Sequence, residues 1–214
     1  MSGSQSNSWL RRFTWLTAFC TLGLIAVGGL VTSHEAGMAV PDWPNTYGYN
    51  MFLFPFSKWI GGILYEHSHR LLASLVGLLT TILAVWLWMR EPTGKYRWAG
   101  LAGFIGVILL MGFRKMPVYI TLASLAPLAI GFALYQIRRQ ADSGLRWWGV
   151  AAFAAVILQG VLGGLRVVLF KDEIGIFHAA LAQLFFVLIC LIAVFLTQWW
   201  RELPTKLTLP WATA

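Results

Sequence analysis

The composition of this 214-residue chain is typical of an integral membrane protein. The chain is 58% hydrophobic and only 11% charged, whereas a soluble domain has about 25% charged residues. The net charge of +8 raises the possibility of a nucleic-acid partner, but the basic residues lie in short segments between long apolar runs. That distribution argues against nucleic acid and indicates a lipid bilayer as the surrounding medium.

Six apolar segments predict six transmembrane helices, because a bilayer core requires about 20 apolar residues per helix. The predicted spans are residues 13–33, 59–89, 98–113, 118–137, 147–169 and 177–200. The third is short, and the Arg-Lys-Met-Pro sequence at 114–117 predicts a tight break after it. The expected fold class is therefore all-α, a polytopic membrane helical bundle formed by residues 1–214 as a single domain.

The basic residues between the spans predict an orientation. One side of the membrane is expected to hold most of them, namely Arg11, Arg12, Arg90, Lys95, Arg97, Arg138, Arg139, Arg146, Arg201 and Lys206. The positive-inside rule then predicts an inner (plasma) membrane protein with both termini cytoplasmic. Arg114 and Lys115 fit this least well, so a re-entrant hairpin for the third and fourth spans remains an alternative.

Two histidines occupy corresponding positions on two helices. His69 lies near the start of the second span and His178 near the start of the sixth, and both starts are expected on the outer side. Two imidazoles at matching depth on two helices are what bis-imidazole ligation of a heme iron requires. We therefore predict that both histidines are heme ligands. The alternatives are a hydrogen-bonded core histidine at 69 and an interfacial histidine at 178.

Other ionisable and polar residues accompany these histidines, and ionisable residues at membrane depth indicate a function. Glu66, His69 and Arg70 share one helix face. Glu66 is expected to transfer protons or to support the ligating imidazole, the alternative being a helix-start acid favoured by the dipole. Gln159 and Arg166 share a face of the fifth span. Arg70 and Arg166 are predicted to pair with the carboxylate tails of the heme.

Three segments together resemble the heme A synthase family. The first is residues 28–33 with the His-Glu-Ala-Gly and Pro-Asp-Trp-Pro sequences that follow. The second is the E-x-x-H-R pattern formed by Glu66, His69 and Arg70. The third is the Q-x-x-L-G-G helix at 159–164, followed by the second histidine helix at 177–181. The resemblance is to the amino-terminal half of the family.

This resemblance implies an oxidoreductase that converts heme O to heme A, by oxidising a porphyrin methyl group to a formyl group, for cytochrome oxidase assembly. It implies heme O as the substrate and heme b as a possible cofactor, with His69 and His178 as iron ligands and Glu66 as the essential acid. Heme O synthase and cytochrome oxidase assembly factors are then expected partners.

The chain departs from the usual family pattern of two similar four-helix halves. Residues 13–89 and 145–200 are predicted to form one four-helix heme-binding core, and residues 97–138 an inserted helical hairpin. A homo-oligomer, most simply a homodimer with one heme per subunit, would restore a second heme site.

Two other functions remain open from the sequence. One is a bis-histidine membrane cytochrome that only transfers electrons, and the other is a non-catalytic heme-binding assembly protein. The acid at Glu66 favours the enzyme, because electron transfer alone requires no acid beside the ligand.

Overall fold

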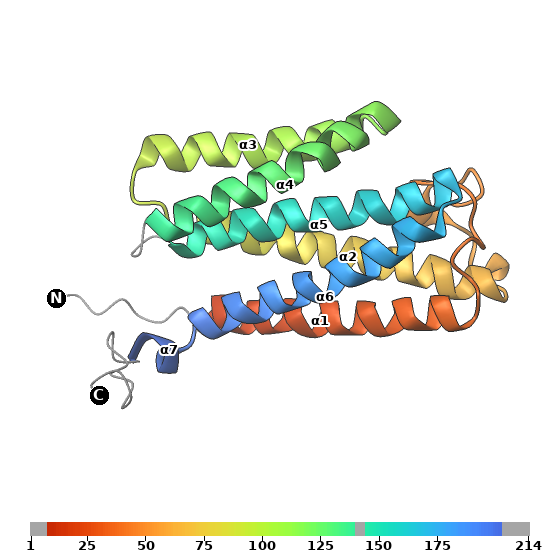
Figure 1. Ribbon diagram of the computed structural model, residues 1–214, viewed down its shortest axis with the longest axis horizontal. Coiled ribbons are helices and arrows are strands. Elements are labelled where there is room, and N and C mark those ends of the chain that lie inside the picture. The colour runs from red at the N-terminus through yellow and green to blue at the C-terminus, as the bar shows by residue number, and fades with distance from the viewer. Residues whose placement is uncertain (1–7, 140–143, 203–214) are drawn as a thin grey trace, which may run out of the picture.

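The computed structural model describes residues 8–139 and 144–202, and all regular elements within them are helices (Figure 1). The elements are α1 (Ser8–Ser33), η1 (Met51–Leu53), η2 (Phe56–Lys58), α2 (Gly62–Trp88), α3 (Gly94–Gly112), α4 (Met116–Arg139), α5 (Gly144–Leu169), α6 (Asp172–Phe195) and α7 (Gln198–Glu202). The predicted all-α polytopic bundle is confirmed. Lys206 and the side chain of Arg201 lie outside the described residues.

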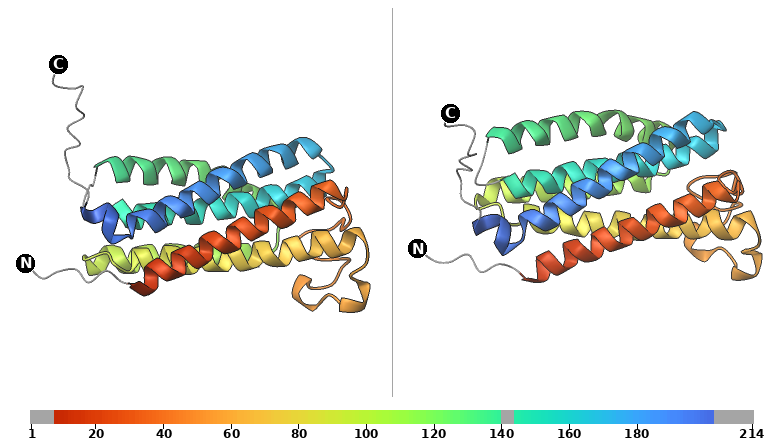
Figure 2. Two further views of the ribbon diagram at one scale, coloured as in Figure 1. Left: turned by 90° about the horizontal axis from the view of Figure 1, so that it is seen from below. Right: turned by 60° about the horizontal axis from the view of Figure 1, so that its bottom comes forward.

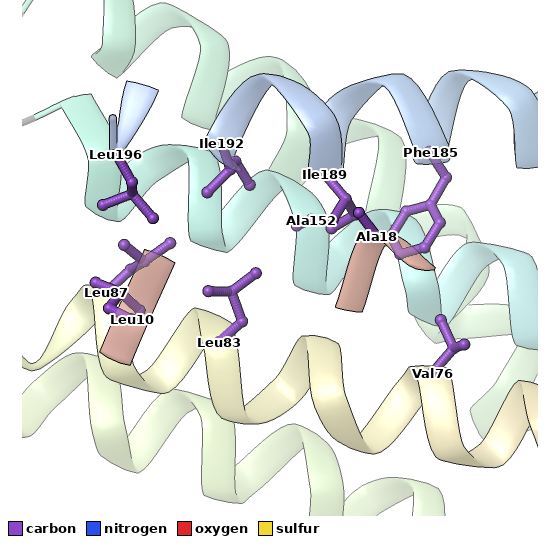
Figure 3. Packing of buried hydrophobic residues seen from close by; sticks show 10 residues of the cluster. All are labelled: Leu10, Ala18, Val76, Leu83, Leu87, Ala152, Phe185, Ile189, Ile192 and Leu196. Atoms are coloured by element: carbon purple, nitrogen blue, oxygen red, sulfur yellow. The ribbon is translucent and has the colours of Figure 1, made fainter. Parts of the chain in front are cut away.

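Four helices form a ring around a shared core. α1 packs against α2 and α6, and α5 packs against the same two helices. The core is apolar and draws on all four helices, as Figure 3 shows, and consists of Leu10, Ala18, Val76, Leu83, Leu87, Ala152, Phe185, Ile189, Ile192 and Leu196. In this ring α2 and α6 stand on one diagonal, and α1 and α5 stand on the other.

The remaining long helices, α3 and α4, lie outside the ring. α4 packs along α5, whereas α3 makes only slight contact with α2 and α4 (Figure 1). The two helices run antiparallel, joined by a short turn in which Arg114 has a positive φ of 51°. This turn is the break predicted at residues 114–117.

Five of the six predicted spans meet the length and apolarity expected of a membrane helix, namely α1, α2, α4, α5 and α6. α3 falls short within the described residues, because Lys95 and Arg97 lie in its first turn. The starts of α1 and α7 lie at one end of the bundle, and the long loop between α1 and α2 lies at the other (Figure 2).

Two predicted helix boundaries need correction. The last span was expected to run to residue 200, but α6 ends at Phe195 and α7 begins at Gln198. Thr197 explains the interruption, since its hydroxyl accepts a hydrogen bond from Trp200 N at 3.2 Å as a helix N-cap does. α6 also begins earlier than expected, with Asp172 and Glu173 in its first turn, where acidic side chains are favoured.

The close approach of α2 and α5 generates a stability prediction. A Cβ at Gly149 would lie 3.2 Å from the Ala84 Cα, and backbone atoms cannot move aside easily. Gly149→Leu should therefore lower the free energy of unfolding by about 1–3 kcal/mol, as overpacking usually does. The matched control is Gly160→Leu on the same helix, where a Cβ meets nothing within 4 Å. Thermal unfolding in detergent measures both, and equal transition temperatures for the two variants would contradict the packing described here.

Candidate functional site

The structure brings His69 and His178 together across the ring. Their ring centroids lie 6.4 Å apart, and the ring planes are inclined by 80°. Two imidazoles that bind one metal from opposite sides, through bonds of about 2 Å, have centroids about 6 Å apart. The two sequence-predicted ligands therefore stand at the separation that a shared metal requires.

His69 lacks the partner that a polar group at membrane depth normally needs. Its imidazole is partly buried and makes no hydrogen bond within residues 8–139 and 144–202. The same residues contain no group of three or more His, Cys, Asp or Glu that could hold a metal alone. A metal held here by two imidazoles therefore needs further ligands from a cofactor.

Two glycines on the other diagonal leave space beside the imidazoles. A Cβ at Gly28 of α1 would lie 3.2 Å from His69 Nε2, and a Cβ at Gly163 of α5 would lie 3.3 Å from His178 Cε1. Any larger residue at these positions would occupy the space against the rings. The glycines thus keep clear a gap that a flat group between the imidazoles needs.

Gln159 contacts the second histidine directly. In the amide orientation that satisfies both of its polar atoms, the nitrogen donates to His178 Nδ1 at 2.9 Å and to His178 O at 3.2 Å, and the oxygen accepts from Ala182 N. This arrangement leaves the imidazole proton on Nε2. Metal binding through Nε2 requires the opposite orientation, in which the amide oxygen accepts a hydrogen bond from Nδ1–H. Gln159 is therefore placed to select the tautomer of His178.

Glu66 and Arg70 form a buried ion pair that anchors the outer loop. Arg70 Nη2 donates to Glu66 Oε1 at 2.6 Å, and the side chains are only 9% and 5% exposed. Glu66 Oε2 accepts from Val40 N, while Arg70 also donates to the carbonyl oxygens of Val40, Asp42 and Asn45. Both side chains thus bind the loop as well as each other, which the shared helix face alone did not indicate.

His67 supports the same loop rather than the histidine pair. It is fully buried, its Nδ1 lies 3.2 Å from Thr46 Oγ1, and its ring packs against Phe54 and Trp59. This contact could not be predicted, since Thr46 lies in a part of the loop without periodic structure. The loop residues Trp43 and Gly164 of α5 also meet, so the loop reaches across the ring.

Arg166 occupies a slot lined by two further glycines. Its guanidinium would lie 2.5 Å from a Cβ at Gly37 and its Nε 2.8 Å from a Cβ at Gly175. Within the described residues its one polar side-chain contact is with Asp172, at 3.4 Å, and its side chain is 24% exposed. Of the two predicted arginines, Arg166 therefore has the guanidinium with more capacity to bind a carboxylate.

Comparisons with known proteins agree with the resemblance seen in the sequence. No protein-family model matches the chain, and no solved structure matches it. The heme A synthase of Lysinibacillus sphaericus is 30% identical over 111 residues, which is 50% of this chain and 33% of that protein. The heme A synthase of Alkalihalophilus pseudofirmus is 31% identical over 103 residues, which is 48% of this chain and 33% of that protein.

A third relative gives the same result over a shorter region. The heme A synthase of Shouchella clausii is 33% identical over 82 residues, which is 38% of this chain and 26% of that protein. The matched region thus spans a third or less of the length of these curated relatives. The predicted resemblance to heme A synthase is confirmed over about half of this chain.

Proposed function

We propose that the four-helix ring binds a heme between His69 and His178, with both imidazoles as axial ligands. The observation that carries this proposal is the 6.4 Å separation of the two rings on diagonal helices. Gly28 and Gly163 support it, because a side chain at either position would fill the space beside a ligating ring. A heme bound there would supply redox chemistry.

We further propose that the chain is a heme A synthase-like oxidoreductase that acts on heme O and oxidises a methyl group to a formyl group. The resemblance to heme A synthases supports this reaction. In this proposal Glu66 is the acid near the reacting edge, and Arg166 holds a carboxylate tail of the heme. Arg70 positions Glu66 through the buried ion pair.

The same proposal includes a location and partners for the protein. The protein lies in the inner membrane with its histidine pair toward the outer side, and heme O synthase and oxidase assembly factors are its partners. A second copy of the chain supplies the second heme site, which holds heme b as the cofactor.

A membrane cytochrome that only transfers electrons is the second candidate, and one observation favours it. Both carboxylate oxygens of Glu66 are already engaged, one by Arg70 and the other by Val40 N. A carboxylate in this position serves as a loop anchor and needs no part in a reaction. The Glu66→Gln variant separates the two functions.

Removal of either proposed ligand should abolish the bis-imidazole site. We expect purified His69→Ala and His178→Ala variants to lose the low-spin optical spectrum and most of their heme, because one imidazole cannot hold the iron from both sides. His34→Ala is the control, since His34 is exposed and stacks on Tyr65 away from the pair. Full heme content and an unchanged spectrum in His69→Ala would exclude His69 as a ligand.

Gln159 should tune heme affinity through the tautomer of His178. When His178 binds iron through Nε2, the amide oxygen of Gln159 turns to accept a hydrogen bond from Nδ1–H. Gln159→Leu removes this acceptor, and loss of such supporting hydrogen bonds typically costs about 10–100-fold in affinity. Heme titration of the purified apoprotein measures this change. Gln183→Leu, an exposed glutamine on α6, is the control and should bind as the wild type does. Equal affinities for both variants would show that Gln159 does not act on the ligand.

Glu66→Gln should retain heme but form no heme A when the chain is co-expressed with a heme O-producing enzyme, as extraction and mass analysis would report. Asp42→Ala is the control for loosening of the loop. The Asp42 carboxylate accepts hydrogen bonds from Tyr47 N and Gly48 N and does not contact Glu66. Product from Asp42→Ala but not from Glu66→Gln assigns a chemical role to Glu66. Formation of heme A by Glu66→Gln at the level of the wild type would contradict that role. Bound heme without heme A in the wild-type protein would favour the cytochrome.

A further inference from the structure

An apolar cavity of about 340 Å³ lies on the inserted hairpin, away from the histidine pair. It is an open groove bordered by α3, α4, α5 and the last turn of α2. The residues that carry the argument are Trp88, Gly103, Phe104, Leu122, Trp147 and Phe153. Its volume falls at the lower end of the range for small-molecule sites, about 300–1,000 Å³.

The cavity has the depth of one leaflet of a bilayer. Along α5 its lining extends from Trp147, near the helix start, to Ile157, a distance of roughly 15 Å at the helical rise of 1.5 Å per residue. The hydrocarbon core of a bilayer is about 30 Å thick. The cavity therefore runs from the end of the bundle that holds the start of α1 to about the membrane centre, which is the length of one acyl chain.

A basic residue of α3, Arg97, lies close in sequence to the residues at the shallow end of this cavity. Arg97 lies one turn before Gly100 and two turns before Phe104, so it shares their face of α3. Its Nε is buried, and its side chain has no hydrogen-bond or ion-pair partner within the residues that the structure describes. The Trp88 indole donates to Arg97 O at 3.2 Å, which fixes the start of α3 against the end of α2.

The surroundings of Arg97 are basic as well. Arg90 is exposed just after α2, and Lys95 is exposed in the first turn of α3. The one acidic residue between them, Glu91, is buried and paired with Arg146. The positive charge of Arg90 and Lys95 complements an acidic headgroup, and basic pockets between membrane helices bind such headgroups. A guanidinium also matches the geometry of a phosphate through paired hydrogen bonds.

We propose that this groove binds one acidic phospholipid of the leaflet at that end of the bundle. One acyl chain fills the cavity between α3, α4 and α5, and the headgroup phosphate binds Arg97. The lipid thereby fills the gap that the slight packing of α3 leaves open.

Two glycines of α3 provide a matched pair for the test. A Cβ at Gly103 or at Gly106 meets nothing within 4 Å, so leucine is tolerated at either position. Gly103 lines the cavity and Gly106 does not. Gly103→Leu should therefore fill the groove, whereas Gly106→Leu makes the same change of residue outside it. Arg97→Gln removes the guanidinium and leaves the cavity as it is.

The experiment is native mass spectrometry of the full chain in detergent, titrated separately with palmitoyl-oleoyl phosphatidylglycerol and palmitoyl-oleoyl phosphatidylcholine. We expect the wild type and Gly106→Leu to bind one phosphatidylglycerol at least tenfold more tightly than phosphatidylcholine. Arg97→Gln should lose this preference, and Gly103→Leu should lose binding of both lipids.

Three results would overturn the proposal. The first is equal affinity of the wild type for the two lipids, which would exclude recognition of the headgroup. The second is unchanged lipid binding by Gly103→Leu, which would place the lipid elsewhere. The third is a wild-type dimer that Gly103→Leu dissociates while its lipid binding stays the same, which would assign the groove to a second copy of the chain. Thermal unfolding of each variant, measured beside the titrations, verifies that the chain is folded.

Discussion

Polar groups at membrane depth must find partners within the protein, because lipid offers none. The buried pair of Glu66 and Arg70 satisfies this constraint twice over, since each side chain binds the other and also the backbone of the loop after α1. Loss of one partner from such a pair typically costs about 3–5 kcal/mol, because the remaining charge is left buried and uncompensated. The loop is thereby held over the end of the ring, and the start of α2 is fixed beneath it.

The same constraint distinguishes the residues that are satisfied from those that are not. His67 contacts Thr46 through Nδ1, although its buried Nε2 has no partner among the described residues, and His178 contacts Gln159. His69 makes no hydrogen bond within the described residues, where the ring of His178 lies 6.4 Å away and the charges of Arg70 and Arg166 also act on it. An imidazole in this position is costly unless a ligand completes it, which is the physical reason for assigning a cofactor to this end of the bundle.

Much of this arrangement could be predicted from the sequence, because helix periodicity and charge act locally. The existence and order of the long helices, the hairpin break at 114–117 and the position of each histidine near a helix start follow from residues near one another in the chain. The hydrogen bonds from Arg70 to the outer loop could not be predicted, since the carbonyl groups that accept them lie in a part of the loop without periodic structure. The end of α6 was also missed, because Thr197 interrupts a run that is apolar on both sides.

The helix α3 packs less closely against its neighbours than the four helices of the ring pack against one another. The ring is closed by aliphatic side chains from four helices, whereas α3 contacts its neighbours slightly and leaves an apolar cavity beside Phe104 and Phe153. The histidine pair and this cavity lie at opposite ends of the bundle, so variants of one should leave the other intact. That separation allows heme binding and lipid binding to be tested independently in the same protein.

Electron paramagnetic resonance of the ferric, heme-loaded protein tests the central claim most directly. The claim is that His69 and His178 ligate one iron, and their ring planes are inclined by 80°. Two axial imidazoles in nearly perpendicular planes give a strongly anisotropic low-spin signal, and that signal is the predicted result. A high-spin signal in the wild type would show that at least one of the two imidazoles is not bound to the iron, and it would contradict the account.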